Sequence, residues 1–271
     1  MLESICSRLA ARRDSPFFRQ TSARAPVKRY LIATTGRTGS TLLCSRIAEY
    51  GDLGFPNEFL NESYISEFER LFPNPSLDDF ERYVSSCFAS RDGVFGLKTD
   101  WWRFRLAREA ELLRAFYEPL DLIVWLRRED FVAQAVSLAL AQATQVWHVR
   151  GDGDGDDDLA ARHAETPFDA RAIIEQARNI LNQEYYWRLY FESCDTPRVE
   201  LTYEDLARNV DDGVQAIADA FDLSFAPRRN SPDVRKARSG VAEAWSARFE
   251  DECADFVAFW REYRGLVSAS G

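Results

Sequence analysis

The segment that decides the fold is YLIATTGRTGSTLLCSRI, which runs from Tyr30 to Ile47. It begins with an apolar run typical of a buried strand, and Gly36 and Gly39 interrupt that run. The residues that follow predict a helix with Ser40 near its start. Because a helix N-terminus presents unpaired N–H groups and a partial positive charge, this order of strand, glycine loop and helix is typical of a phosphate site.

The loop departs from the nucleotide-hydrolase pattern GxxxxGK[ST] at two defining positions. In the matching window, Thr34 replaces the first glycine and Ser40 replaces the lysine. A basic residue occurs earlier in the loop, as Arg37. The pattern therefore argues against magnesium–triphosphate chemistry. On local pattern alone, an ordinary strand-to-helix turn with one exposed arginine is an equally good interpretation.

Composition limits the partners of the chain. It has 271 residues, of which 46% are hydrophobic, so it can bury a sizeable core. The formal net charge of −10 argues against nonspecific binding to nucleic acids or anionic membranes. No apolar run is long enough for a membrane span, so no stable membrane insertion is expected. A local basic cluster could still bind a small anion, because salt screens distant charges.

Cysteine and histidine usage favours a cytoplasmic protein without a metal site. The five cysteines are scattered and form no CxxC pair, which is typical of a reducing compartment. Only two histidines are present, so no zinc site is expected.

Further strands alternate with helical segments along the chain. Strands are predicted at residues 30–35, 93–98, 120–126 and 198–203. Helices are predicted at residues 40–50, 105–117, 129–142, 168–193 and 204–223, over most of 64–90, and from about Val241. Strands alternating with helices predict an α/β domain with a P-loop-like parallel sheet flanked by helices.

The sequence predicts one domain with a preceding leader segment and one low-complexity loop. Residues 1–27 are interpreted as a loose N-terminal leader, and residues 28–271 as a single domain. The low-complexity segment RGDGDGDDDLAARH predicts a mobile acidic loop at about residues 151–165. Such a loop could cover an acceptor site.

At this point the sequence resembles the bacterial trehalose 2-sulfotransferase family. The resemblance lies in motifs that occur in the family's order and together span roughly Tyr30 to Leu223: GRTGST, GFPNEF, GVFGLKTDW, LRREDFVAQAVS and QVW. Members of that family move a sulfuryl group from 3′-phosphoadenosine 5′-phosphosulfate (PAPS) to a sugar hydroxyl. The resemblance implies a three-layer α/β/α sulfotransferase fold.

The resemblance also implies how the donor is bound. The glycine loop would hold the 5′-phosphosulfate end of PAPS without a metal, through Arg37, Thr38, Gly39, Ser40 and Thr41. Arg128 and Ser137 would hold the 3′-phosphate, since an arginine fork can pair two phosphate oxygens. Arg127 is the alternative if the register shifts by one residue. A late basic loop could add Lys236 and Arg238, although a solvated loop is an equally good interpretation.

The expected catalytic base is Glu58, which stands in the family's PxEF setting 21 residues after Arg37. Partial burial beside Phe55 and Phe59 is expected to raise its pKa and make it a better base. Arg37 is expected to stabilise charge on the leaving phosphate. His148 is the rival base, with a structural or substrate-contacting role as its alternative.

Three residues are candidate contacts for the acceptor: Lys98, Trp101 and His148. Lys98 ends a predicted strand and would assist the leaving group or touch the acceptor, unless it only snorkels to the surface. Trp101 could stack on a sugar or belong to the core. The acceptor would be a small molecule, a glycan or a glycolipid, trehalose being only one of the candidates. Members of the family can form dimers, which leaves a homodimer open.

Two other functions remain as alternatives. A P-loop kinase or nucleotide hydrolase would need a magnesium site, for which no second acidic motif is evident. A catalytically inactive homologue that binds a nucleotide or a partner protein would be expected to lack the residues named above.

Overall fold

The computed structural model describes residues 2–12, 26–147, 161–225 and 240–269. These divide into two compact units, and each is described by itself. The first comprises Met1–Arg127 and Tyr190–Ser231, and the second comprises Arg128–Leu189 and Pro232–Gly271. Among the described helices, none is both long and apolar enough to cross a membrane.

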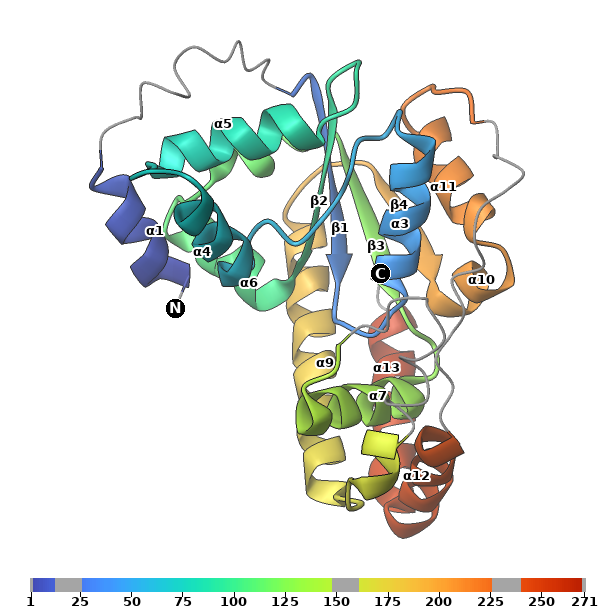
Figure 1. The fold of residues 1–271 in the computed structure, drawn as a ribbon. Helices are drawn as coiled ribbons and strands as arrows, with labels where there is room; N and C mark the ends of the chain where they lie inside the picture. The colour runs from blue at the N-terminus through green and yellow to red at the C-terminus, as the bar shows by residue number, and fades with distance from the viewer. Residues whose placement is uncertain (1, 13–25, 148–160, 226–239, 270–271) are drawn as a thin grey trace. The chain divides into compact units, whose positions relative to one another are not determined.

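The first unit is built on a four-stranded parallel sheet in the order β2-β1-β3-β4 (Figure 1). The strands are β1 (Lys28–Thr34), β2 (Val94–Asp100), β3 (Leu122–Arg127) and β4 (Arg198–Thr202). All four strands predicted from apolar runs are confirmed, with ends shifted by a few residues. Parallel strands with both faces covered read as nearly continuous apolar runs, which explains why these were easy to recognise.

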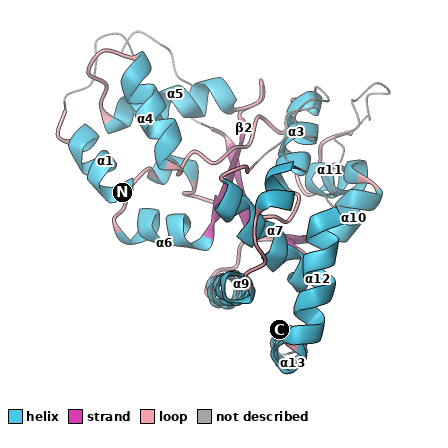
Figure 2. Ribbon diagram, turned by 60° about the horizontal axis from the view of Figure 1, so that its bottom comes forward, coloured by secondary structure: helices cyan, strands magenta, loops and turns pink. Residues whose placement is uncertain are grey.

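Alternate side chains of the strands enter two apolar layers. On one face, Tyr30, Ile32 and Val124 pack with helices α3 (Ser40–Tyr50) and α11 (Val210–Asp219). On the other face, helices include α4 (Glu62–Leu71), α5 (Leu77–Phe88), the short η1 (Arg114–Phe116) and the end of α9, which contributes Phe191 against Trp125. Helices therefore cover both faces of the sheet, as Figure 2 shows, and the three-layer α/β/α prediction is confirmed.

The N-terminal segment is not entirely a loose leader, and that expectation is wrong for its first residues. Leu2–Ala10 form helix α1, which packs against α4 and α5. Its buried side chains are Leu2, Ile5, Cys6 and Leu9. Their i, i+3, i+4, i+7 spacing gives one apolar face, which is why the segment is stable only where other helices cover it. Residues 13–25 lie outside the description.

Two predicted helices are divided in the structure. The segment 105–117 was expected to form one helix, but α6 (Trp101–Glu109) starts earlier because Asp100 caps it by accepting from the Arg103 N–H. Glu111 and Leu113 then take left-handed backbone angles that end the helix. The segment 204–223 divides at Asn209, whose side chain caps α11 after α10 (Tyr203–Arg208) has ended.

The second unit is helical. Its elements are α7 (Phe131–Thr144), most of α9 (Ala170–Glu192), α12 (Gly240–Glu252) and α13 (Ala254–Ala269). Their core contains Phe131, Ile180, Phe249 and Val257. The three helices predicted here are confirmed, and the C-terminal one is a pair. Of the predicted acidic loop, residues 161–165 are helical and residues 148–160 lie outside the description.

Candidate active site

The loop after β1 has the backbone shape that an anion site requires. Gly36, Arg37 and Gly39 all have positive φ angles, of 79°, 55° and 77°. Left-handed residues among right-handed ones turn successive N–H groups toward one concave side, where an anion can bind. The hydroxyls of Thr34 and Thr38 hydrogen-bond to each other at 2.6 Å and close the loop.

Helix α3 begins directly at this loop. Its N-cap is Gly39, which has no side chain to satisfy the N–H groups of the first turn. A Cβ on Gly39 would also lie 2.8 Å from the Tyr203 ring, so α10 enforces glycine here. Ser40 is buried, Thr41 is exposed, and Arg37 is half-buried at the loop apex. The five loop residues predicted for phosphate binding are thus gathered at one helix N-terminus, which favours a bound anion.

Glu58 is held beside the sheet by backbone contacts. Asn57 forms a parallel bridge with Leu97 of β2, and its carbonyl accepts from the Lys98 N–H at 3.0 Å. Phe59 and Leu60, which follow Glu58, are fully buried. The segment therefore fixes Glu58 next to β2 although it belongs to no strand itself.

The Glu58 carboxylate forms an ion pair with Lys98. The Lys98 Nζ lies 2.8 Å from Oε1 of Glu58, and the two side chains are 4% and 36% exposed. Asn61 donates to Oε2 at 3.3 Å. The candidate base is thus held from both oxygens while part of it remains accessible.

The expectation that burial raises the pKa of Glu58 is wrong in its net result. Burial does raise it, but the charge and hydrogen bond of Lys98, together with Asn61, outweigh burial and hold the pKa below its usual value. Burial alone would lower the pKa of Lys98, whereas Cys44 and Glu58 keep it raised. Both shifts favour the ionised pair, so Glu58 is a carboxylate at neutral pH and can accept a proton.

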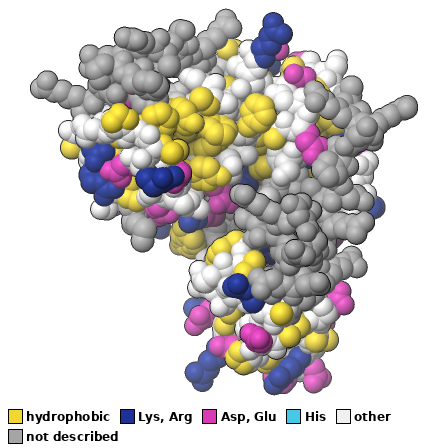
Figure 3. Space-filling view, in the orientation of Figure 1, with side chains coloured by type: hydrophobic (Ala, Val, Ile, Leu, Met, Phe, Trp, Pro, Cys, Tyr) yellow, Lys and Arg dark blue, Asp and Glu magenta, His cyan; other side chains and the backbone are white. Residues whose placement is uncertain are grey.

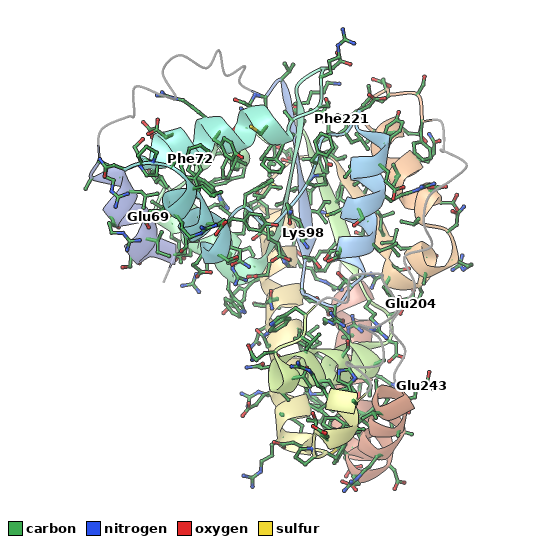
Figure 4. All side chains as sticks on the ribbon, viewed as in Figure 1. Glu69, Phe72, Lys98, Glu204, Phe221 and Glu243 are labelled. Carbon is green, nitrogen blue, oxygen red and sulfur yellow. The ribbon has the colours of Figure 1, made fainter. Side chains whose placement is uncertain are left out.

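Strand register brings the ion pair and the phosphate loop to the same end of the sheet, where the strands have their carboxyl ends. β1 and β2 pair Ile32 with Lys98 and Thr34 with Asp100. Lys98, labelled in Figure 4, therefore lies beside Ile32, two residues before the end of β1 where the loop starts. The carboxyl edge of a parallel sheet is where α/β proteins bind ligands.

Charged and aromatic groups extend this edge. Arg103 pairs with Asp100 and lies 3.6 Å from Glu62. Trp101 is half-buried, with ring contacts to Phe104 and Tyr190. These contacts are typical of a core residue, and a role for Trp101 in acceptor binding stays a prediction.

Exposed aromatic side chains occur in the same segments. Phe55 precedes Glu58 by three residues and Trp102 follows Asp100 by two, and both are exposed. The space-filling view in Figure 3 shows hydrophobic side chains gathered on one face of the first unit.

The residues expected at the 3′-phosphate lie between the end of β3 and the middle of α7. Arg127 is the last residue of β3, whereas Arg128 and Ser137 belong to the second unit, where Arg128 is buried and Ser137 half-buried. Their binding role stays a prediction. His148, Lys236 and Arg238 lie outside the described residues.

Sequence reasoning missed two residues that contact the candidate site residues. Asn61 supports the Glu58 carboxylate, and its only signal was its position three residues after Glu58, at the N-cap of α4. Arg264 on α13 contacts the backbone of Arg128 and lies in no recognised motif.

Together, an anion loop without the Walker lysine and a carboxylate at the carboxyl end of the same parallel sheet are typical of an α/β group-transfer enzyme. The family model for Stf0 sulphotransferases matches residues 29–252. The chain therefore belongs to the Stf0 sulphotransferase family and is an enzyme that transfers sulfuryl groups.

Two curated relatives have the same name. Trehalose 2-sulfotransferase of Mycobacterium tuberculosis (strain ATCC 35801 / TMC 107 / Erdman) is 28% identical over 268 residues, covering 83% of this chain and 96% of the relative. Trehalose 2-sulfotransferase of Mycolicibacterium smegmatis (strain ATCC 700084 / mc(2)155) is 24% identical over 259 residues, covering 81% and 93%. The resemblance to this family is thereby confirmed.

Two solved structures are also similar. The sulfotransferase domain of the Synechococcus PCC 7002 olefin synthase has 15% identity and a TM-score of 0.41, covering 87% of this chain and 97% of that one. The sulfotransferase domain from the curacin biosynthetic pathway has 12% identity and a TM-score of 0.42, covering 85% and 98%. The fold assignment rests on the four-stranded parallel sheet described above.

Proposed function

We propose that this enzyme transfers the sulfuryl group of PAPS to a hydroxyl of a carbohydrate or glycolipid acceptor. The observation that carries the proposal is the Glu58–Lys98 ion pair, which lies at the same sheet edge as an anion loop without the Walker lysine. The two trehalose 2-sulfotransferases among its relatives support a sugar-like acceptor.

The proposed reaction is an in-line displacement at sulfur. Glu58 accepts the proton of the acceptor hydroxyl as that oxygen forms its bond to sulfur. The bond from sulfur to the bridging oxygen of the donor breaks, and the electron pair leaves with adenosine 3′,5′-bisphosphate. The products are a sulfate ester and the bisphosphate, and no metal is required.

The loop acts on the leaving group. Arg37 and the N–H groups from Thr38 to Thr41 stabilise the negative charge that develops on the 5′-phosphate. By analogy with phosphoryl transfer, positioning and electrostatic stabilisation supply most of the rate. Arg128 and Ser137 are the residues proposed for the 3′-phosphate.

Lys98 acts through Glu58 in this proposal. With its Nζ on Oε1 of Glu58, the ammonium keeps the carboxylate ionised and directed toward the acceptor. A second contact of Lys98 with the acceptor or leaving group is compatible with the position of Lys98 at the carboxyl edge of β2. The free cysteines of the chain fit a location in the cytoplasm.

Thermal shift with two ligands tests the donor site. Adenosine 3′,5′-bisphosphate is compared with ATP–magnesium, and a ligand at 100 times its dissociation constant adds about 2.7 kcal/mol of stability. We expect stabilisation by the bisphosphate. Stabilisation by ATP–magnesium alone would favour a kinase, and no response to either would favour an inactive homologue. Incubation with PAPS and a panel of sugars then identifies the acceptor.

A further inference from the structure

Arg264 on α13 lies at the centre of a hydrogen-bonded cluster in the second unit. Its Nε and Nη2 donate to the two oxygens of Glu184 on α9, at 3.0 and 2.6 Å. Its Nη1 donates to the Glu129 carbonyl at 2.9 Å and its Nη2 to the Arg128 carbonyl at 2.8 Å. The guanidinium also lies 5.7 Å from the centre of the Phe131 ring. One side chain thus joins α9, α13 and the turn before α7.

This arrangement is partly shielded from solvent and is specific to arginine. The side chains of Arg264 and Glu184 are 15% and 7% exposed. A planar guanidinium can pair with both carboxylate oxygens on one edge and still present donors to carbonyls on another, which a lysine ammonium cannot do. Because a buried charge without a partner is costly, Glu184 holds Arg264 in place and Arg264 in turn holds the carbonyls.

The two carbonyls belong to the residues just before the α7 N-cap, Asp130, which accepts from the Ala133 N–H. Arg128 is buried in this turn. Binding the carbonyls of Arg128 and Glu129 from one side fixes the peptide planes on which the Arg128 side chain depends. Helix α13, which supplies these two hydrogen bonds, lies outside the family match that ends at residue 252.

We infer that Arg264 is a positioning residue for donor binding, which aligns Arg128 for the 3′-phosphate without touching the donor. The inference rests on the proposed function, in which Arg128 binds that phosphate. A binding arginine gains affinity when its geometry is set before the ligand arrives, because ordering costs are then already met. Arg264 would therefore act on the 3′-phosphate alone and leave recognition of the rest of the nucleotide unchanged.

The test measures the contribution of the 3′-phosphate directly. Isothermal titration gives the dissociation constants of adenosine 3′,5′-bisphosphate and adenosine 5′-monophosphate, and their ratio is the preference for the 3′-phosphate. Arg264→Lys can keep a charge beside Glu184 but cannot reach both carbonyls as well. We expect the preference to fall roughly ten- to hundredfold in this variant, as for a misplaced binding group. The affinity for the monophosphate should stay the same.

Three further variants separate positioning from a general loss of structure. Arg261→Ala removes an exposed arginine of the same helix, which pairs with Glu250, and should leave the preference unchanged. The double variant Arg264→Met with Glu184→Leu removes both buried charges, so it should stay folded and still lose the preference. In an Arg128→Ala background, Arg264→Lys should cause no additional loss.

Each result has one meaning. If the wild-type protein itself shows no preference for the bisphosphate, the proposed donor site is wrong. If the wild-type protein shows the preference and the folded Arg264 variants keep it, the donor site stands and the positioning role of Arg264 is overturned. If the losses from Arg264→Lys and Arg128→Ala add in full, the two residues act independently and the inference is likewise overturned.

Discussion

At the scale of single residues, the proposed chemistry depends on how the Glu58 carboxylate is held. Glu58 has a partly exposed side chain, with a buried lysine on one oxygen and an asparagine on the other. A carboxylate whose pKa is lowered is a weaker base than one whose pKa is raised, but it is fully ionised at neutral pH. The Lys98 ammonium therefore keeps the proposed base ionised but makes it a weaker base.

Replacing the proposed base, Glu58, should remove turnover but not donor binding. We expect Glu58→Gln to lower kcat by about 10²- to 10⁴-fold, since the amide cannot accept the acceptor proton. The affinity for adenosine 3′,5′-bisphosphate should stay within about twofold, because the loop is unchanged. Steady-state kinetics and titration of the bisphosphate measure both.

The matched control is Glu67→Gln on the exposed side of α4, where the carboxylate pairs only locally with Arg70. It should retain full activity. Unchanged kcat in Glu58→Gln would assign the base to another residue, with His148 the first to examine.

Removing the lysine should move the acid limb of the pH profile. The Lys98 ammonium lowers the pKa of Glu58 while burial raises it, so in Lys98→Met only burial and the weaker contacts remain. The pKa of Glu58 then rises, and kcat/KM should begin to fall at a higher pH than in the wild-type enzyme. Lys28→Met, at the opposite end of the sheet, should leave the profile unchanged. If the acid limb of the profile stays in place, Lys98 does not control the pKa of the group that acts as the base.

The sequence identified these residues singly and could not reveal the pair. Glu58 and Lys98 were found because each stands in a motif, but the pair depends on the parallel bridge between Asn57 and Leu97, which joins a loop to a strand far along the chain. Because the sequence does not reveal this contact with Lys98, the predicted direction of the Glu58 pKa shift was wrong. Burial can be estimated from neighbouring apolar residues, whereas a charge from another element cannot.

At the scale of elements, the turn between β1 and α3 depends on glycine for two reasons. Gly39 has a left-handed backbone and faces the Tyr203 ring, where a Cβ would approach to 2.8 Å. The strands and most helices followed from apolar runs and helix periods. The breaks within the predicted helices 105–117 and 204–223 could not be predicted in this way. Glu111 and Asn209 end helices through backbone angles and caps, which the apolar pattern does not reveal.

Substituting this glycine should damage the anion site specifically. Gly51 is the matched control, since it also has a left-handed backbone, at the C-terminus of α3, but with open space around its Cβ position. Both Gly39→Ala and Gly51→Ala should lose roughly 1–2 kcal/mol of unfolding free energy from backbone strain, and Gly39→Ala more because of the clash. Only Gly39→Ala should weaken binding of adenosine 3′,5′-bisphosphate.

Denaturant unfolding and titration of the bisphosphate measure the two effects. If Gly39→Ala binds as tightly as the wild-type protein, or if Gly51→Ala weakens binding equally, the loop is not the phosphate site.

At the scale of the whole molecule, stability draws on parts that carry no motif. Helix α1 contributes buried apolar side chains, and Arg8 and Arg12 of the same segment pair with Glu69 of α4. Leu9→Ala should lower the unfolding free energy by about 2–5 kcal/mol, as expected for a fully buried leucine. Leu71→Ala, at an exposed position of α4, should change it by less than about 0.5 kcal/mol. Equal, small losses would mean that α1 adds little to the core.

The packing of α1 also affects where the gene of such an enzyme can be truncated for expression. The family match starts at residue 29 and ends at residue 252, so neither α1 nor α13 falls within it. A gene trimmed to those limits would keep every motif yet leave apolar patches on α4 and α5 open to solvent, inviting aggregation during expression. In this enzyme the folded structure therefore extends beyond the residues that the family match covers, at both ends.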